Sequence, residues 1–408
     1  MGNFFERRIN LKKTLNIIVY ILLVVMIIVN VTLITRDLEP DLSLGEMSVK
    51  IKNNLLGGPD SKLEQMEQLI QDKFIEDTDS VALEDAAAYA MVDAMGDRWS
   101  YYIPAADYQA HQEQMENAYV GIGITILIQE DGSGILVQQV TKGGPAEEAG
   151  VLPRDLIVEI AGQSTKGMET TDARDLVRGE EGTTVELKAL RDGRELDFTV
   201  ERRTIETVVA EGRMLDDTTG YVHIYNFDTR CAEESIAAIE MLLDQGAEKL
   251  IFDVRFNPGG YAHELVELLD YLLPEGELFR TVDYAGREDV DMSDADCLDI
   301  PMAVLVNEDS YSAAEFFAAA LRDYDAAFVV GQKTFGKGYF QTTYRLMDGS
   351  AVNISIGKYF TPKGVSLAGV GITPDIELNV DDEMYWNIYA GTLDPAGDPQ
   401  IQAAIEGF

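Results

Sequence analysis

Segments of strand-like composition alternate with segments of helical spacing between residues 204 and 380. This alternation predicts an α/β core, because strands and amphipathic helices must bury their apolar sides against one another. The expected strands are 221–225, 250–254, 303–306 and 328–330. The expected helices are 231–245, 262–272 and 313–322.

The whole chain is too long for one typical domain, because it has 408 residues and an average domain has about 150. Hydrophobic residues make up 46% of it, which is enough for a sizeable core. Changes in sequence texture predict several regions. They are a cytoplasmic N-terminus (1–14), a transmembrane signal anchor (15–34), a helical region (35–110), a compact domain of short strands (111–203), the α/β core (204–380) and a short helical or extended tail (381–408).

The helical region and the domain after it differ in periodicity. Apolar residues from Leu63 to Phe74 recur at helical spacing, and a second helix is expected from a cap at Thr78–Ser80 to Met95. The next domain should contain one helix and a hairpin turn at Asp192-Gly193. Its expected strands are 121–128, 135–140, 156–160, 184–190 and 195–200, and its expected helix is 171–178.

The N-terminal apolar stretch, Leu15–Ile34, is about the ~20 residues that span a bilayer as a helix. Basic residues before it predict that the N-terminus stays in the cytoplasm and that the bulk of the chain is exported. Thr35-Arg36-Asp37 follows, with no A-x-A cleavage site, which favours an uncleaved anchor over a cleaved signal peptide. The basic residues are Arg7, Arg8, Lys12 and Lys13.

Charge and metal-ligand content exclude several classes of function. The formal net charge of −40 repels phosphates and disfavours nucleic acid as a partner. Two cysteines, Cys231 and Cys297, are too few for a disulfide framework, so we expect free or buried thiols. No CxxC or HExxH spacing occurs among the cysteines and three histidines, so we expect no metal site.

Ser312 lies between a short apolar strand and an alanine-rich helix. Free N–H groups and the dipole at a helix N-terminus favour a developing negative charge. A serine there is suited to act as a nucleophile, and the N–H of Ala313 can serve as an oxyanion donor. Taken alone, the segment is better explained by Ser312 as an ordinary N-cap.

A Pro258-Gly259-Gly260 turn follows the strand expected at 250–254. Glycines leave backbone N–H groups accessible, because no side chain stands in the way. Gly259 or Gly260 could therefore supply a second oxyanion donor. The alternative is an ordinary strand-to-helix turn.

Lys337 lies between Gly336 and Gly338, which suits neither a helix interior nor a strand interior. Tyr339 and Phe340 could form an apolar wall that lowers the lysine pKa toward neutrality, as a general base requires. Gln341 follows four residues later on the same face and could orient the amine. Taken alone, Lys337 is better explained as a loop lysine in solvent.

Histidine chemistry is the competing possibility. His263 follows the glycine turn closely, but there is no G-x-S-x-G elbow and no marked Asp partner. We therefore interpret His263 as a helix-start residue and His223 as a strand residue.

These segments together resemble the C-terminal processing (tail-specific) protease family of serine peptidases. The resemblance covers most of the chain after the apolar stretch, and five blocks in the family order support it. The blocks are 253–260 (DVRFNPGG), 310–315 (SYSAAE), 336–341 (GKGYFQ), 359–364 (YFTPKG) and 369–375 (GVGITPD). Given them, the catalytic interpretation of Ser312 and Lys337 becomes the favoured one.

The resemblance implies a multidomain α+β fold: an N-terminal transmembrane helix, a helical segment, a PDZ domain and a ClpP/crotonase-like α/β protease core. In this family a PDZ domain binds the C-terminal residues of the substrate. The segment Val120-Gly121-Ile122-Gly123-Ile124 is similar to its carboxylate-binding loop. Arg178 stands where some relatives have an arginine linked to activation; a surface residue at a helix end is the alternative. Phe256 replaces a usually polar residue of the glycine turn.

The implied mechanism needs no cofactor. Ser312 attacks, neutral Lys337 takes its proton, Gln341 orients Lys337, and N–H groups of Gly259 or Gly260 and of Ala313 hold the oxyanion. The implied partners are protein substrates through their free C-termini, the cell membrane, and a second copy in a homodimer. The rival hypothesis is a non-catalytic membrane-tethered PDZ receptor that binds peptides without turnover.

Overall fold

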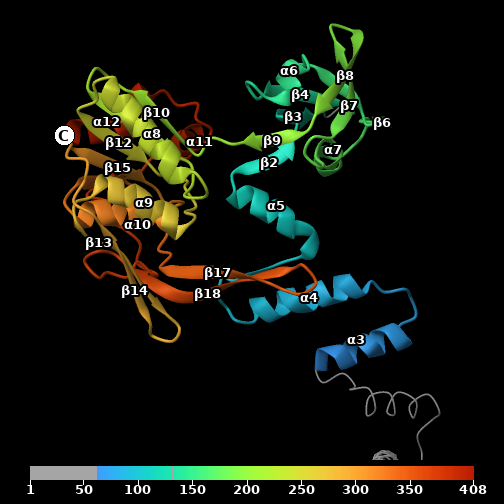
Figure 1. Cartoon of the computed structure of the whole chain (residues 1–408), viewed down its shortest axis with the longest axis horizontal. Coiled ribbons are helices and arrows are strands. Elements are labelled where there is room, and N and C mark those ends of the chain that lie inside the picture. Colours follow the sequence, from blue (N-terminus) through green and yellow to red (C-terminus); the bar gives the residue numbers. More distant parts are fainter. Residues whose placement is uncertain (1–61, 130–131) are drawn as a thin grey trace, which may run out of the picture. The chain divides into compact units, whose positions relative to one another are not determined.

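The computed structural model describes residues 62–129 and 132–408, which fall into two compact units that divide between Ala94 and Met95 (Figure 1). The predicted membrane segment at 15–34 lies outside the described residues. Among the helices in the described ranges, none has the length and apolar character needed to cross a bilayer.

The first unit shows two helices, α3 (Lys62–Lys73) and α4 (Ser80–Asp93), as the periodicity predicted. Asp79 caps α4, because its carboxylate accepts the backbone N–H groups of Val81 and Ala82. Neither helix contains a buried residue. Their apolar side chains therefore build no core of their own in the described part of this unit.

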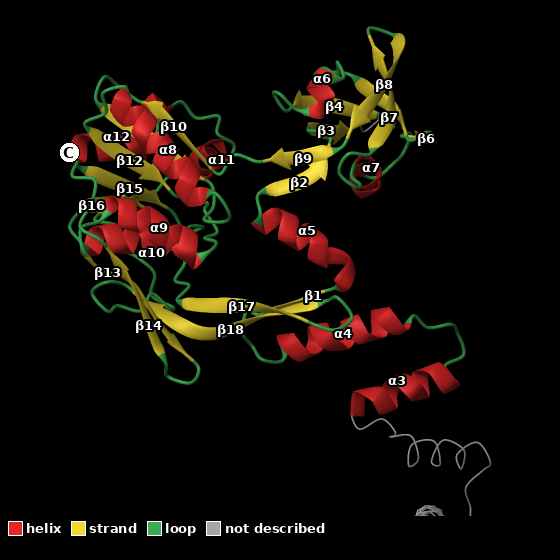
Figure 2. Ribbon diagram, viewed as in Figure 1, coloured by secondary structure: helices red, strands yellow, loops and turns green. Residues whose placement is uncertain are grey.

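The central sheet of the second unit has the strand order β10-β11-β12-β15-β16-β19 (Figure 2). All neighbours pair in parallel except β10 and β11, which are antiparallel. The strands are β10 (Ala210–Met214), β11 (Thr219–Ile224), β12 (Lys249–Asp253), β15 (Met302–Val306), β16 (Ala327–Gly331) and β19 (Ile376–Glu377). The helices between them are α8 (Cys231–Asp244), α9 (Ala262–Leu272) and α10 (Ala313–Asp323). The predicted α/β alternation is confirmed.

The two faces of this sheet bury different cores. On one face, Phe252 and Val304 belong to a large cluster with α8, α9 and α10. On the other face, Ile251 and Leu305 pack with Ile401. Ile401 belongs to α12 (Pro399–Gly407), so the C-terminal tail is an integral layer of the core.

A second sheet contains strands that the sequence did not predict. It joins β1-β18-β13-β14 in antiparallel order, and β17 also pairs with β18. The strands are β1 (Tyr101–Ile103), β13 (Gly276–Asp283), β14 (Glu288–Ser293), β17 (Tyr339–Arg345) and β18 (Ala351–Phe360). This sheet brings residues near position 100 beside residues near 353, so it links the start of the unit to the α/β core.

The small domain has its own sheet of strands around a separate core that includes Ile135, Val185 and Val200. The strand predicted at 121–128 is interrupted, because Gly123 has φ +73 and turns the chain. The Asp192-Gly193 hairpin is present, with positive φ at both residues. The elements are β3 (Ile124–Ile128), β4 (Ile135–Val140), α6 (Pro145–Glu148), β5 (Leu156–Ile160), β6 (Gln163–Ser164), α7 (Thr170–Val177), β7 (Thr184–Arg191) and β8 (Arg194–Glu201).

Two short strands connect this small domain to the rest of the unit. β2 (Ala118–Gly121) enters it and β9 (Arg203–Glu206) leaves it, and they pair antiparallel with each other. The helix α5 (Ala105–Met115) precedes β2. The entry and exit of the domain are therefore side by side.

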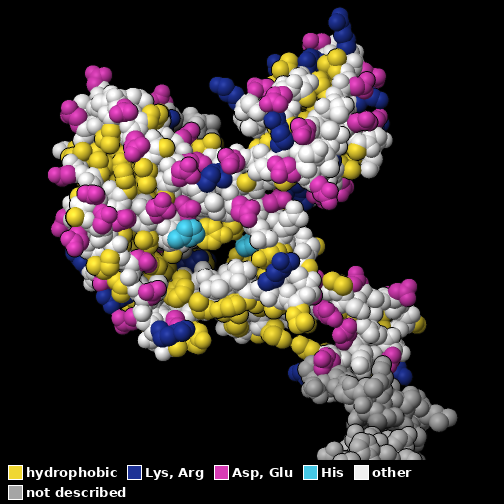
Figure 3. Space-filling view, viewed as in Figure 1, with side chains coloured by type: hydrophobic (Ala, Val, Ile, Leu, Met, Phe, Trp, Pro, Cys, Tyr) yellow, Lys and Arg dark blue, Asp and Glu magenta, His cyan; other side chains and the backbone are white. Residues whose placement is uncertain are grey.

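Acidic side chains are distributed over both domains of the second unit. Figure 3 shows Asp and Glu scattered over the visible face, with hydrophobic and uncharged surface between them. The net charge of −40 therefore does not concentrate in one patch on that face. Both cysteines are free, as expected: Cys231 is buried and Cys297 is exposed.

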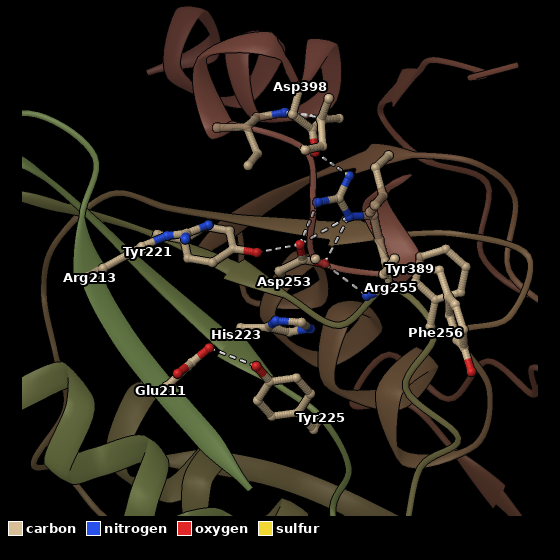
Figure 4. A pocket seen from close by; sticks show the side chains of 15 residues that line it. Glu211, Arg213, Tyr221, His223, Tyr225, Asp253, Arg255, Phe256, Tyr389 and Asp398 are labelled. Atoms are coloured by element: carbon tan, nitrogen blue, oxygen red, sulfur yellow. Dashed lines mark hydrogen bonds and ion pairs between the residues drawn. The ribbon is translucent and has the colours of Figure 1, made fainter. Parts of the chain in front are cut away.

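Arg255 anchors the tail through a buried ion network (Figure 4). Its guanidinium pairs with Asp253 at 2.5 Å and with Asp398 at 2.8 Å, and it also donates to Gln400. Tyr221 donates its hydroxyl to Asp253 from the neighbouring strand. Asp253 and Arg255 thus form an ion pair, and both residues line a cavity of about 370 Å³.

We expect Asp398→Ala to lower the free energy of unfolding by about 3–5 kcal/mol, because it leaves a buried guanidinium short of one anion and uncaps α12. Asp394→Ala is the control, because that residue caps only an exposed turn and should cost about 1 kcal/mol. Urea unfolding followed by fluorescence measures both. Equal losses for the two variants would contradict the role given to the buried network.

Candidate active site

The loops that follow β12 and β15 meet at Ser312. A Cβ atom placed on Gly259 would lie 2.7 Å from Ser312 Cβ and 2.9 Å from the Ala313 nitrogen. Gly259 also has φ +87, a conformation that favours glycine. The glycine turn and the serine loop are thus in direct contact, because they follow adjacent parallel strands.

Ser312 holds a strained backbone conformation at the N-cap of α10, with φ 61 and ψ −122. A non-glycine residue there costs on the order of 1–3 kcal/mol and persists only where its surroundings enforce it. Ser310 anchors the loop before it, because its hydroxyl donates to the carbonyl of Val254 at 2.7 Å. Such strain at a strand-to-helix turn is typical of functional serines.

Only some of the predicted oxyanion donors are available. The N–H of Gly259 donates to Asn257 Oδ1 at 2.8 Å, so it is already engaged. No described residue accepts a hydrogen bond from the N–H of Gly260 or of Ala313. Gly260 and Ala313, rather than Gly259, therefore have N–H groups free for a ligand in this conformation.

Glu315 is fully buried and joins the serine loop to the lysine loop. Its carboxylate accepts the backbone N–H groups of Ser312 at 3.1 Å, Gly336 at 2.7 Å and Lys337 at 2.8 Å, and the hydroxyl of Thr334 at 2.5 Å. Burial raises its pKa, while these hydrogen bonds act in the opposite direction. Sequence analysis assigned no role to Glu315, although Ser312-x-x-Glu315 has the spacing of a capping box.

Lys337 has the lowered pKa that a general base requires. Burial lowers it to about 8, although the negative charges of Asp97 and Glu315 act to raise it. Its Nζ lies 4.6 Å from the centre of the Trp99 ring. An aromatic neighbour of Lys337 is therefore Trp99, from a segment more than two hundred residues away, which the sequence did not predict.

Gln341 has other partners than the lysine it was predicted to orient. Its Nε2 donates to the Tyr339 carbonyl at 2.9 Å and to Ser355 Oγ at 3.1 Å. A register shift between Phe340 and Gln341 breaks the strand alternation on which the shared face was predicted. Ser355 also hydrogen bonds to Asp97, which acts electrostatically on Lys337, so the connection is indirect.

The packing of its ring explains why a phenylalanine stands at position 256. It stands in the glycine turn with φ 61, and its N–H donates to Asn307 Oδ1 at 2.9 Å. Its ring packs edge-on against Tyr385, 4.8 Å away, and Tyr389, 5.3 Å away. Both tyrosines belong to α11 (Asp382–Tyr389), and Tyr385 also donates its hydroxyl to Asp309 of the serine loop. The tail helix therefore supports both loops.

The histidines do not form part of this arrangement. The side chain of His263 is 71% exposed at the start of α9, and His223 lies in β11 with its ring beside Tyr225. Burial lowers the pKa of His223. Both are placed as the sequence predicted. Within the ranges described, no three His, Cys, Asp or Glu residues are arranged to hold a metal ion.

The segment predicted to bind a carboxylate, Val120–Ile124, forms the end of β2 and the start of β3. Gly123 turns the chain between them. Arg178 follows α7, pairs with Glu113 of α5 at 2.8 Å, and lies 5.1 Å from the Tyr119 ring centre. Arg178 therefore joins the small domain to the helix that precedes it.

Known proteins are similar to this chain in sequence. Residues 218–378 match the model of peptidase family S41, and residues 136–191 match a PDZ domain. The carboxy-terminal processing protease CtpA of Bacillus subtilis is 32% identical over 324 residues, which are 79% of this chain and 69% of that protein. The chain belongs to the family of carboxy-terminal processing proteases. It is a serine-type peptidase with a PDZ domain.

Further relatives show the same pattern. A CtpA-like serine protease of Staphylococcus saprophyticus is 33% identical over 78% of this chain and 65% of its own length. The solved photosystem II D1 C-terminal processing protease is 26% identical, with a TM-score of 0.47, over 82% of this chain and 88% of that one. The chain spans about two thirds of the two curated relatives.

We expect Glu315→Gln in the S41 peptidase to lower kcat/KM at least ~100-fold, because the amide NH₂ would face backbone donors that now meet a carboxylate. The Ser312 and Lys337 loops would lose hydrogen bonds to residue 315, so the melting temperature should also fall. Peptide cleavage and thermal unfolding measure the two effects. Glu308→Gln, an exposed residue of the same loop, is the control, and unchanged cleavage by Glu315→Gln would refute the positioning role.

Proposed function

We propose that the protein cleaves protein substrates near their C-termini through a Ser312–Lys337 pair. Ser312 attacks the scissile carbonyl, and the neutral amine of Lys337 takes its proton. The N–H groups of Gly260 and Ala313 hold the oxyanion. An acyl-enzyme forms on Ser312 Oγ, the amine product leaves with the proton from Lys337, and water then releases the acyl group.

One observation carries this assignment. Glu315 binds the backbone of both Ser312 and Lys337, so a strained serine at a helix N-terminus and a lysine of lowered pKa belong to one buried cluster. The predicted role of Gln341 is retained in indirect form, through Ser355 and Asp97.

We further propose that the PDZ domain captures the free C-terminus of the substrate at Val120–Ile124. Backbone N–H groups around a glycine turn suit a carboxylate, and the adjoining strand suits an extended peptide. Arg178, in its ion pair with Glu113, is a candidate for transmitting occupancy of this domain to α5.

We expect Ser312→Ala and Lys337→Ala each to abolish cleavage of a tail peptide while melting as the unmodified protein does. In the unmodified protein, kcat/KM should rise with pH up to about 8, because Lys337 acts in its neutral form. Activity at pH 6 should be ~100-fold below the plateau, since two pH units below the pKa only about 1% of the amine is neutral.

Cleavage of the tail peptide by Lys337→Ala, or a kcat/KM that does not change between pH 6 and 8, would contradict Lys337 as the base. His263→Ala should leave activity unchanged, which separates this mechanism from a histidine-based one. Peptide binding without turnover by the unmodified protein would favour the non-catalytic receptor.

The apolar stretch 15–34 supports a proposal for location: a single-pass anchor with the peptidase outside the cytoplasm. The full chain should sediment with membranes, whereas a chain beginning at residue 35 should not. Protease should digest the peptidase when it is added to cells whose outer layer is permeable and whose cell membrane is intact. Recovery of the full chain in the soluble fraction would refute the anchor.

A further inference from the structure

Asp228 has a buried carboxylate oxygen, Oδ1, to which no described residue donates a hydrogen bond. The residue is 7% exposed in the loop between β11 and α8, and among described atoms nothing bonds to its buried Oδ1. Leaving a polar atom of this kind unsatisfied is costly, and native proteins retain few such groups. Its retention points to a partner that binds from outside the chain.

The surroundings of Asp228 are acidic. Burial and then the negative charge of Glu264 raise the pKa of Asp228 to about 7. Glu264 uses its own oxygens on the N–H groups of Arg230 and Ala232. The Arg230 guanidinium is committed to Glu234 and to three backbone carbonyls. His263 Nε2 lies 3.8 Å from Glu264 Oε1, so the histidine faces Glu264. Among the described residues no lysine or arginine pairs with Asp228.

Asp228 acts electrostatically on two tyrosines, and the N–H of one of them, Tyr261, donates to the carbonyl of Phe227, the residue before Asp228, at 2.7 Å. Burial first, and then the charge of Asp228, raise the pKa values of Tyr101 and Tyr261, so both phenols lie within electrostatic reach of the carboxyl group. Tyr101 is 43% exposed, and Tyr261 is half-buried. A carboxylate beside tyrosine rings suits an organic cation, which gains both ion pairing and cation–π contact.

This cluster adjoins the turn that faces Ser312. Phe227 forms a strand bridge with Gly260, and a Cβ atom on Gly260 would lie 2.6 Å from the Asp228 nitrogen. The preceding residue of the turn, Gly259, contacts Ser312. Asp228 therefore borders the turn that contacts Ser312, and an extended peptide advances only about 3.3 Å per residue.

We propose that Asp228, together with Tyr101 and Tyr261, binds a basic side chain of the substrate, lysine or arginine, close to the scissile bond. This inference rests on the proposed proteolysis at Ser312. It makes Asp228 a specificity-determining residue: it contacts the substrate and takes no part in the bond-breaking step. A metal ion fits the site poorly, since Glu264 is already bonded and no third ligand is present among the described residues.

The test compares peptides that carry lysine or its uncharged isostere norleucine at each of the three positions on either side of the scissile bond. With the full chain, lysine at one position should raise kcat/KM about tenfold, as expected for a hydrogen-bonded charge pair. Asp228→Asn should reduce this preference to less than about twofold while still cleaving the norleucine peptide.

Two controls separate the site from general effects. Asp244→Asn removes the same charge from the exposed end of α8 and should keep the preference for lysine. Asp228→Asn should melt no lower than the unmodified protein, because it removes a buried charge that has no cation. A preference for lysine that survives in Asp228→Asn, or no preference at any position, would overturn the proposal.

Binding distinguishes failure of this proposal from failure of proteolysis. The Ser312→Ala chain should bind the lysine peptide about tenfold more tightly than the norleucine peptide, and Asp228→Asn in that background should equalise the two. If the Ser312→Ala chain binds the lysine and norleucine peptides with equal affinity, the site is refuted even if the unmodified protein cleaves peptides. Absence of cleavage with a retained affinity difference would refute only the proteolysis.

Discussion

The buried carboxylate of Glu315 is the interaction on which the arrangement around Ser312 depends. Ser312 has an unfavourable backbone conformation, and the Lys337 loop has flexible glycines on both sides, so neither is fixed by local preference. Backbone N–H groups of both loops converge on this one carboxylate. Charge-assisted hydrogen bonds offset the cost of burying it. Positioning of Ser312 and Lys337 is thereby a single structural event.

The contact between the glycine turn and Ser312 could be predicted because its causes are local. Each loop follows an apolar strand and precedes an amphipathic helix, and the helix predicted at 262–272 has those bounds in the structure. Since β12 and β15 are parallel neighbours, the loops after them share one edge of the sheet. The composition of the two loops indicated this part of the site, whereas the strand order that brings them together is seen only in the structure.

The parts that escaped prediction depend on contacts distant in sequence. Trp99 reaches Lys337, and Asp398 reaches Arg255, across separations that no periodicity encodes. β14 has three acidic residues among six and only two apolar ones, Val290 and Met292, so its sequence lacks the run rich in β-branched and aromatic residues that marks a strand. The register shift before Gln341 shows the same limit, because one irregular residue reverses which face a side chain occupies.

The pairing of β2 with β9 has a consequence for how such a protein could arise. Since the strands that enter and leave the PDZ domain are hydrogen-bonded neighbours, the domain occupies the position of a long loop between adjacent points of the chain. Insertions are best tolerated where the two ends are close together, because the host fold needs no rearrangement. A peptidase ancestor could therefore have acquired its PDZ domain in one genetic step. Recombination at the same two strands could later exchange it for another recognition domain.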